Sequence, residues 1–174
     1  MNSAKKIVNV VKQKILIVED EPMLLEMLVD LSESFGFDVL PASNGQLAIE
    51  ILKAQKVDII LSDINMPLVS GLQLLIKCRK MNVTAPFVFL TGNSSIDTII
   101  DAVRLGAIDF MVKPFEFEAL EKVLRRVSVI AEKLDYIDEL LNSIGKDVAP
   151  QTHDEIENLR RQINLLKTMS QGES

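Results

Sequence analysis

Side chains that form disulfides or bind soft metals are nearly absent from this chain of 174 residues, which has one cysteine, Cys78, and one histidine, His153. A single cysteine excludes a disulfide within the chain. The two residues together are also too few to supply the Cys and His ligands of a zinc site. Both absences fit a protein of the reducing cytoplasm, and we expect that location.

Long apolar runs and dense basic stretches are missing as well. Lysines interrupt the N-terminal sequence before it could form the apolar part of a secretion signal, and no segment approaches the length of a membrane span. The net charge is -6, and the arginine pairs at 125–126 and 160–161 stand apart from other basic residues. Because nucleic-acid binding requires clustered Lys and Arg, we expect a soluble protein that contacts neither membrane nor nucleic acid.

The chain does contain a regular alternation of short, largely apolar runs and helical patterns. Apolar residues make up 48% of it, enough for one core and an appendage. The helical patterns lie between runs that we interpret as strands: KILIV (14–18), FDVLP (37–41), VDIILS (57–62), FVFLT (87–91) and AIDFMV (107–112). Strands without polar alternation are buried on both faces, which predicts an α/β fold with a doubly wound parallel sheet.

Polar residues follow four of these runs, where strands of a parallel sheet end at one shared edge. They are Glu19, Asp20 and Glu21 after the first run, Asp63 after the third, Thr91 after the fourth and Lys113 after the fifth. Several carboxylates beside one lysine suit a hard divalent cation, Mg²⁺ or Mn²⁺, with Asp20 and Asp63 as the first ligands. Such an ion would let Asp63 attack a phosphoryl group whose oxygens Thr91 and Lys113 hold.

Four segments, in the order ILIVEDEP, DIILSDINMPLVSGLQLL, FVFLTGNSS and LGAIDFMVKPF, resemble the receiver domain of bacterial two-component response regulators over about residues 14–126. The resemblance implies a flavodoxin-like sheet of five strands. It also implies phosphoryl transfer to an aspartate from a histidine kinase or phosphotransfer protein. The implied roles are Asp63 as phosphoacceptor, Glu19 and Asp20 as the acid pair at the metal, the backbone carbonyl of Asn65 as a further metal ligand, Thr91 and Lys113 at the phosphoryl group, Phe110 as an aromatic switch, and a cis Lys113–Pro114 bond.

These residues also have plain structural interpretations. Asp63 could cap the turn after its strand, Thr91 could be an ordinary strand residue, and Phe110 could be a core aromatic. Phosphatases that use an aspartate nucleophile with Thr and Lys are an alternative for the whole site. They need a second acid two residues after the nucleophile, where this chain has Asn65, so we expect a regulatory phosphoacceptor and not an enzyme.

The C-terminal part continues the helical pattern beyond the expected domain. We divide the chain into a polar lead (1–13), the receiver domain (14–127), a coiled-coil continuation of its last helix (128–145), a linker (146–151) and a short amphipathic helix with a tail (152–174). The apolar seam has three- and four-residue spacing, and its members are Leu120, Val123, Val127, Ile130, Leu134, Ile137, Leu141 and Ile144. His153 falls in the first turn of the last helix, where we expect a solvated residue without a phosphotransfer role.

This seam predicts a homodimer through a parallel coiled coil. An alternative is that the segment 152–174 folds back as a hairpin and covers the seam within one chain. Two hypotheses for the output follow. Either phosphorylation of Asp63 changes dimerisation or the binding of a partner protein, or the chain is a non-switching assembly module built on a receiver scaffold.

Overall fold

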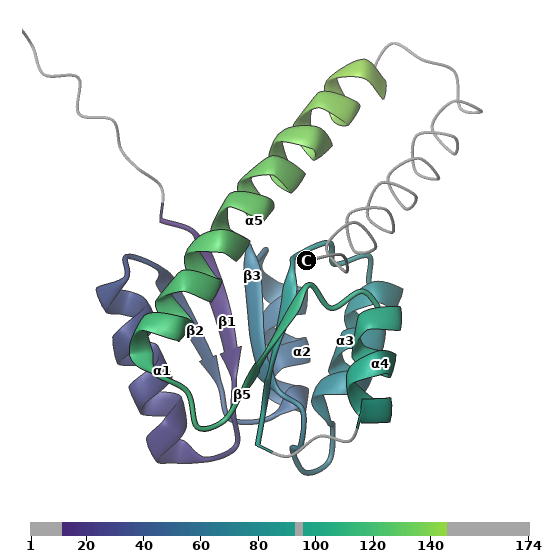
Figure 1. Ribbon diagram of the computed structural model, residues 1–174. Coiled ribbons are helices and arrows are strands. Elements are labelled where there is room, and N and C mark those ends of the chain that lie inside the picture. Colours follow the sequence, from purple (N-terminus) through teal and green to yellow (C-terminus); the bar gives the residue numbers. More distant parts are fainter. Residues whose placement is uncertain (1–11, 93–95, 146–174) are drawn as a thin grey trace, which may run out of the picture.

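Strands and helices alternate five times in the computed structural model, which describes residues 12–92 and 96–145 (Figure 1). The strands are β1 (Lys14–Val18), β2 (Asp38–Ala42), β3 (Ile59–Asp63), β4 (Phe87–Thr91) and β5 (Asp109–Val112). The helices are α1 (Pro22–Ser34), α2 (Gly45–Ala54), α3 (Gly71–Lys80), α4 (Ile96–Arg104) and α5 (Phe117–Gly145). All strand pairs are parallel, in the order β2-β1-β3-β4-β5, which confirms the predicted doubly wound, flavodoxin-like sheet.

The central strands are buried on both faces, as their unbroken apolar runs predict. Leu16 and Ile60 point into a core that α2, α3 and α4 cover. Their neighbours Ile17 and Leu61 point into a second core, on the opposite face, that α1 and α5 cover. The helices therefore enclose the sides of the sheet and leave the carboxyl ends of the strands accessible at one edge.

The two outer strands differ slightly from the predicted runs. β2 starts one residue later and includes the exposed Pro41, which an edge strand tolerates because one side of its backbone needs no donor. β5 starts only at Asp109 because Gly106, with φ of +87°, first ends the preceding helical turn.

Helix α5 has 29 residues and continues well past the sheet (Figure 1). The helix runs without a break through Val127, where we place the end of the domain, and the segment 128–145 continues it as expected. Leu120 and Val127, which belong to the predicted seam, are fully buried in the core beneath α5. This part of the seam packs within its own chain, since Leu124 and Ala131 complete the same buried face.

Two polar contacts attach the next turns of α5 to the edge of the sheet where the strands begin. The Gln13 side chain donates to the carbonyl of Ser128 at 3.1 Å, and the Lys56 ammonium lies 2.6 Å from the Asp135 carboxylate. The coiled coil itself stays a prediction. The linker 146–151 and the segment 152–174 with His153 lie outside the described residues. In the ranges 12–92 and 96–145, no helix has both the length and the apolar character to cross a membrane.

Candidate functional site

The residues predicted at the strand ends do meet at one edge of the sheet. Glu19 directly follows β1, Asp63 is the last residue of β3, and Thr91 is the last residue of β4. Lys113 follows β5, and its backbone N–H donates to the carbonyl of Thr91 at 2.7 Å. Adjacent parallel strands thus place four side chains from distant parts of the sequence in one site.

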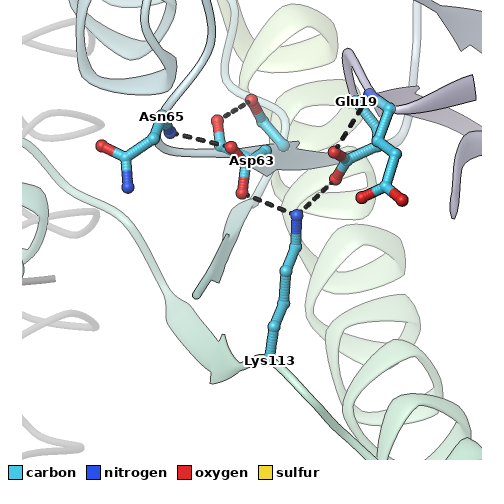
Figure 2. Close-up of polar contacts among 6 residues, drawn as sticks. Glu19, Asp63, Asn65 and Lys113 are labelled. Atoms are coloured by element: carbon cyan, nitrogen blue, oxygen red, sulfur yellow. Dashed lines mark hydrogen bonds and ion pairs between the residues drawn. The ribbon is translucent and has the colours of Figure 1, made fainter. Parts of the chain in front are cut away.

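The Lys113 ammonium lies between two buried carboxylates (Figure 2). Its Nζ atom is 2.6 Å from Oε2 of Glu19 and 2.8 Å from Oδ1 of Asp63. The other oxygen of Asp63, Oδ2, accepts a hydrogen bond of 2.8 Å from the backbone N–H of Asn65. Both oxygens of the Asp63 carboxylate are therefore held in fixed directions, in a side chain that is only 7% exposed.

Burial and charge act in opposite directions on the two partners of this contact. Burial raises the pKa of Glu19, and the neighbouring Lys113 only partly offsets this effect. Burial alone would lower the pKa of Lys113, but its hydrogen bonds with Asp63 and Glu19 outweigh the burial and raise that pKa. Lys113 is thus a permanent cation at neutral pH, and Glu19 is a carboxylate whose negative charge the site accommodates at a cost.

A third acid makes the local charge negative overall. Glu19, Asp20 and Asp63 each offer a carboxylate oxygen, and these atoms all lie within 4.8 Å of one another. Asp20 is exposed, whereas the other two are buried. Three carboxylates and the Lys113 ammonium leave a net charge of about -2 if all are ionised, and oxygen donors at this spacing fit a hard divalent cation such as Mg²⁺ or Mn²⁺.

The turn after Asp63 depends on the absence of a side chain at Gly71, the first residue of α3. A Cβ atom there would lie 2.2 Å from the carbonyl oxygen of Asp63 and 2.9 Å from the ring of Phe89. The helix can start this close to the strand end because Ser70 and Gln73 form a capping box at its N-terminus. Gly71 therefore positions the backbone that carries the candidate phosphoacceptor.

The remaining predicted residues occupy different environments. Thr91 is buried at the end of β4, next to the strand that ends in Asp63. Phe110 is 42% exposed on β5, so it is not an ordinary core aromatic. Glu21 lies at the N-cap of α1, where its side chain makes no capping hydrogen bond. The Lys113–Pro114 bond is cis, as the resemblance implies.

Sequence reasoning assigned only the backbone carbonyl of Asn65 to the site and missed its N–H, which orients Asp63. The signal was available, because an aspartate side chain often accepts a hydrogen bond from the backbone two residues later in a turn. The sequence also places Glu19 and Lys113 at the same edge of the sheet, but their direct contact was missed because strand ends give no distances between side chains.

Comparisons with known proteins give a consistent result. A family model described as the response regulator receiver domain matches residues 15–125. Transcriptional regulatory protein MalR of Bacillus subtilis is 40% identical over 112 residues, which cover 63% of this chain and 48% of MalR. Transcriptional regulatory protein ZraR of Escherichia coli is 29% identical over 142 residues, which cover 79% of this chain and 32% of ZraR. The chain thus spans about half, or less, of the length of these relatives.

Among solved structures, chemotaxis protein CheY4 of Vibrio cholerae shares 29% identity and a TM-score of 0.64, covering 67% of this chain and 99% of that one. The family model covers more than half of this chain, and its matched residues include every strand end that forms the site. This chain therefore belongs to the response regulator receiver domain family of two-component signalling.

Proposed function

We propose that this chain is a phosphorylation-operated switch in which Asp63 accepts a phosphoryl group from a histidine kinase or a phosphotransfer protein. The observation that carries the proposal is the arrangement around Asp63. One carboxylate oxygen faces the Lys113 ammonium at 2.8 Å, and the other is oriented by the Asn65 N–H beside the acid pair Glu19 and Asp20.

In the proposed step, an oxygen of Asp63 attacks the phosphorus of a phosphohistidine. The new O–P bond forms as the P–N bond breaks, and the imidazole leaves with the electron pair of that bond. A bound Mg²⁺ or Mn²⁺ would neutralise charge on the phosphoryl oxygens and orient them. Glu19, Asp20, Asp63 and the carbonyl of Asn65 would hold this ion, and the Thr91 hydroxyl would donate to a phosphoryl oxygen.

Lys113 connects this chemistry to a change of state. Before transfer, its ammonium balances Glu19 and Asp63. The transferred group brings additional negative charge to Asp63, so Lys113 gains a stronger partner among the phosphoryl oxygens. A rearrangement around Lys113, Thr91 and Phe110 would then be the signal passed to the rest of the molecule.

The same site argues for a regulatory role and against substrate turnover. Self-catalysed transfer and hydrolysis of the aspartyl phosphate are the only reactions we assign to it. A phosphatase mechanism would need an acid at the position of Asn65, whose amide cannot shuttle a proton. We place this activity in the cytoplasm, where phosphorylated kinases of this class present their histidines.

For the output, we propose dimerisation or partner binding through the helical extension 128–145. The length of α5 supports an extension that reaches beyond the sheet. The same feature would serve the competing function, a non-switching assembly module. The longer relatives, of which this chain matches a part, are named for transcription, so nucleic-acid binding is compatible with the family. The contacts that we propose for residues 128–145 themselves are with protein.

Incubation with acetyl phosphate and Mg²⁺, followed by intact-mass measurement, tests the phosphoacceptor. We expect one added phosphoryl group, no addition when the metal is chelated, and no addition to Asp63→Asn. Asp38→Asn, which removes an exposed carboxylate at the opposite end of the sheet, should be modified like the original protein. An adduct that persists in Asp63→Asn would contradict the proposal.

Light scattering before and after this treatment tests the output. A change in molar mass on phosphorylation supports the switch, whereas an unchanged dimer supports the assembly module. A monomer under both conditions would exclude dimerisation by the extension.

A further inference from the structure

The side chain of Arg79, in the last turn of α3, is a partly buried cation. No ion pair joins it to a carboxylate among residues 12–92 and 98–140, whose side chains the structure describes. Its guanidinium donates to backbone carbonyls instead. Nη1 donates to the carbonyl of Val83 at 2.7 Å, and Nη2 donates to the carbonyl of Gly106 at 2.9 Å. Burial lowers the pKa of the Arg79 guanidinium, because it removes water from the charge. The hydrogen bonds to the backbone carbonyls compensate for that lost water.

The two carbonyls belong to different connections. Val83 lies between α3 and β4, whereas Gly106 lies between α4 and β5. The planar fork of Arg79 thus joins the C-terminal end of α4 to the neighbouring helix and loop. A lysine could not reproduce this, because one ammonium lacks two donors in fixed, divergent directions.

Backbone contacts reinforce the same end of α4. The N–H of Ala107 donates to the carbonyl of Ala102 at 3.0 Å, and the N–H of Ile108 donates to the carbonyl of Phe87 at 2.8 Å. Gly106 has a left-handed backbone conformation, which turns the chain from α4 toward β5. The chain at the C-terminal end of α4 is therefore bonded both to β4 and to Arg79 of α3.

The body of α4 is held much less firmly. Over residues 98–104, where side-chain burial is described, only Ala102 is fully buried. Ile100 and Val103 remain 40% and 49% exposed. A methyl group contributes little apolar burial, so the described part of α4, residues 98–104, is attached to the sheet by less buried apolar surface than the other helices are.

The opposite end of α4 points toward the candidate site, because the chain reaches this helix from Thr91 at the end of β4. We infer that Arg79 is a positioning residue that fixes a pivot at Gly106, so that a change at Thr91 tilts α4 about its C-terminal end without releasing it. The tilt rests on the proposed function, whereas the anchoring of Gly106 by Arg79 is a property of the unphosphorylated protein.

Hydrogen exchange of individual backbone amides in the full chain tests the anchor first. Compared with the original protein, Arg79→Gln should speed exchange at Leu105–Ile108 by about tenfold or more, the scale of losing hydrogen bonds to a charged group. Arg79→Lys should be nearly as fast, since it keeps the charge and loses the fork. Lys80→Gln, at the exposed next position, should leave these amides unchanged.

Unchanged exchange at Leu105–Ile108 in Arg79→Gln would overturn the anchor. An equal acceleration in β1 would do the same, because it would show a general loss of stability.

Adding beryllium fluoride with Mg²⁺, as an analogue of the phosphoryl group, tests the pivot. In the original protein, exchange should change at residues 98–101 and stay constant at 105–108. In Arg79→Gln the change should extend through both segments, a response that a merely structural residue would not alter. Equal changes in both segments of the original protein would overturn the pivot. If the analogue changes hydrogen exchange at none of Asp63, Asn65 and α4, the proposed function is contradicted, and the tilt with it. The exchange measured without the analogue still decides whether Arg79 anchors Gly106.

Discussion

Asp20→Asn should stabilise the protein in the absence of metal. The Asp20 carboxylate oxygen lies within 4.8 Å of oxygens from Glu19 and Asp63. Two unit charges at this distance repel by about 0.9 kcal/mol in water and about 3.5 kcal/mol at an effective dielectric constant of 20. Asp20 is exposed, so the lower value applies. Two such repulsions, offset by one attraction to Lys113, leave a gain of about 1 kcal/mol, or about 2–4 °C in Tm for a chain of this size.

With Mg²⁺ bound, the original protein should become more stable than Asp20→Asn. An ion that binds only the folded protein stabilises it by about 2.7 kcal/mol at one hundred times its Kd. The original protein should therefore overtake Asp20→Asn once Mg²⁺ exceeds about five times the Kd of the original site, because the variant has lost a metal ligand.

Urea denaturation with and without Mg²⁺ measures both effects, with Glu26→Gln as the control. Glu26 is an exposed carboxylate on α1 outside the acid cluster, so its removal should change neither the stability nor the response to Mg²⁺. Lower stability of Asp20→Asn than of the original protein without metal, or equal stabilisation of both by Mg²⁺, would contradict the repulsion within the acid cluster.

Three further predictions concern packing around the site and in the core. Gly71→Ala should destabilise the protein by about 1–3 kcal/mol and slow the modification of Asp63 by acetyl phosphate, because the new Cβ would lie 2.2 Å from the Asp63 carbonyl oxygen. Urea denaturation measures the stability, and intact mass measures the modification. Unchanged stability together with an unchanged modification rate would contradict the close approach. Ser32→Ala should stabilise by about 1 kcal/mol, since the buried Oγ has no hydrogen-bond partner among the described residues; a clear loss of stability in thermal unfolding would refute this. Burial raises the pKa of Cys78 to about 11, so its alkylation at pH 8 should proceed only at the rate of unfolding, and rapid labelling of the native protein would disagree.

The sheet could be predicted because its central strands carry the signal of burial on both faces. Leu16 and Ile17 point into different cores, so both must be apolar, and the same holds for Ile60 and Leu61. The site followed from this, because the residue after each strand necessarily lies at the shared edge. Asp63 and Lys113 could thus be brought together without knowledge of any distance.

The parts that could not be predicted depend on contacts with the backbone or on competing partners. Arg79 lies in the basic stretch KCRK, which is typical of a solvated helix end, and its partners are carbonyls that have no side-chain signature. The seam of α5 has the spacing of a coiled coil, but Leu120 and Val127 are buried against the sheet of their own chain. Apolar periodicity identifies a buried face without identifying what covers it.

The proposed transfer to Asp63 is tested most directly by locating the modified residue. The protein is treated with acetyl phosphate and Mg²⁺, reduced with borohydride, which converts an aspartyl phosphate to homoserine, and digested for peptide mass spectrometry. We expect homoserine at position 63 and unmodified aspartate at positions 20 and 58. Homoserine at another position, or none when the metal is present, would contradict the assignment of Asp63 as the phosphoacceptor.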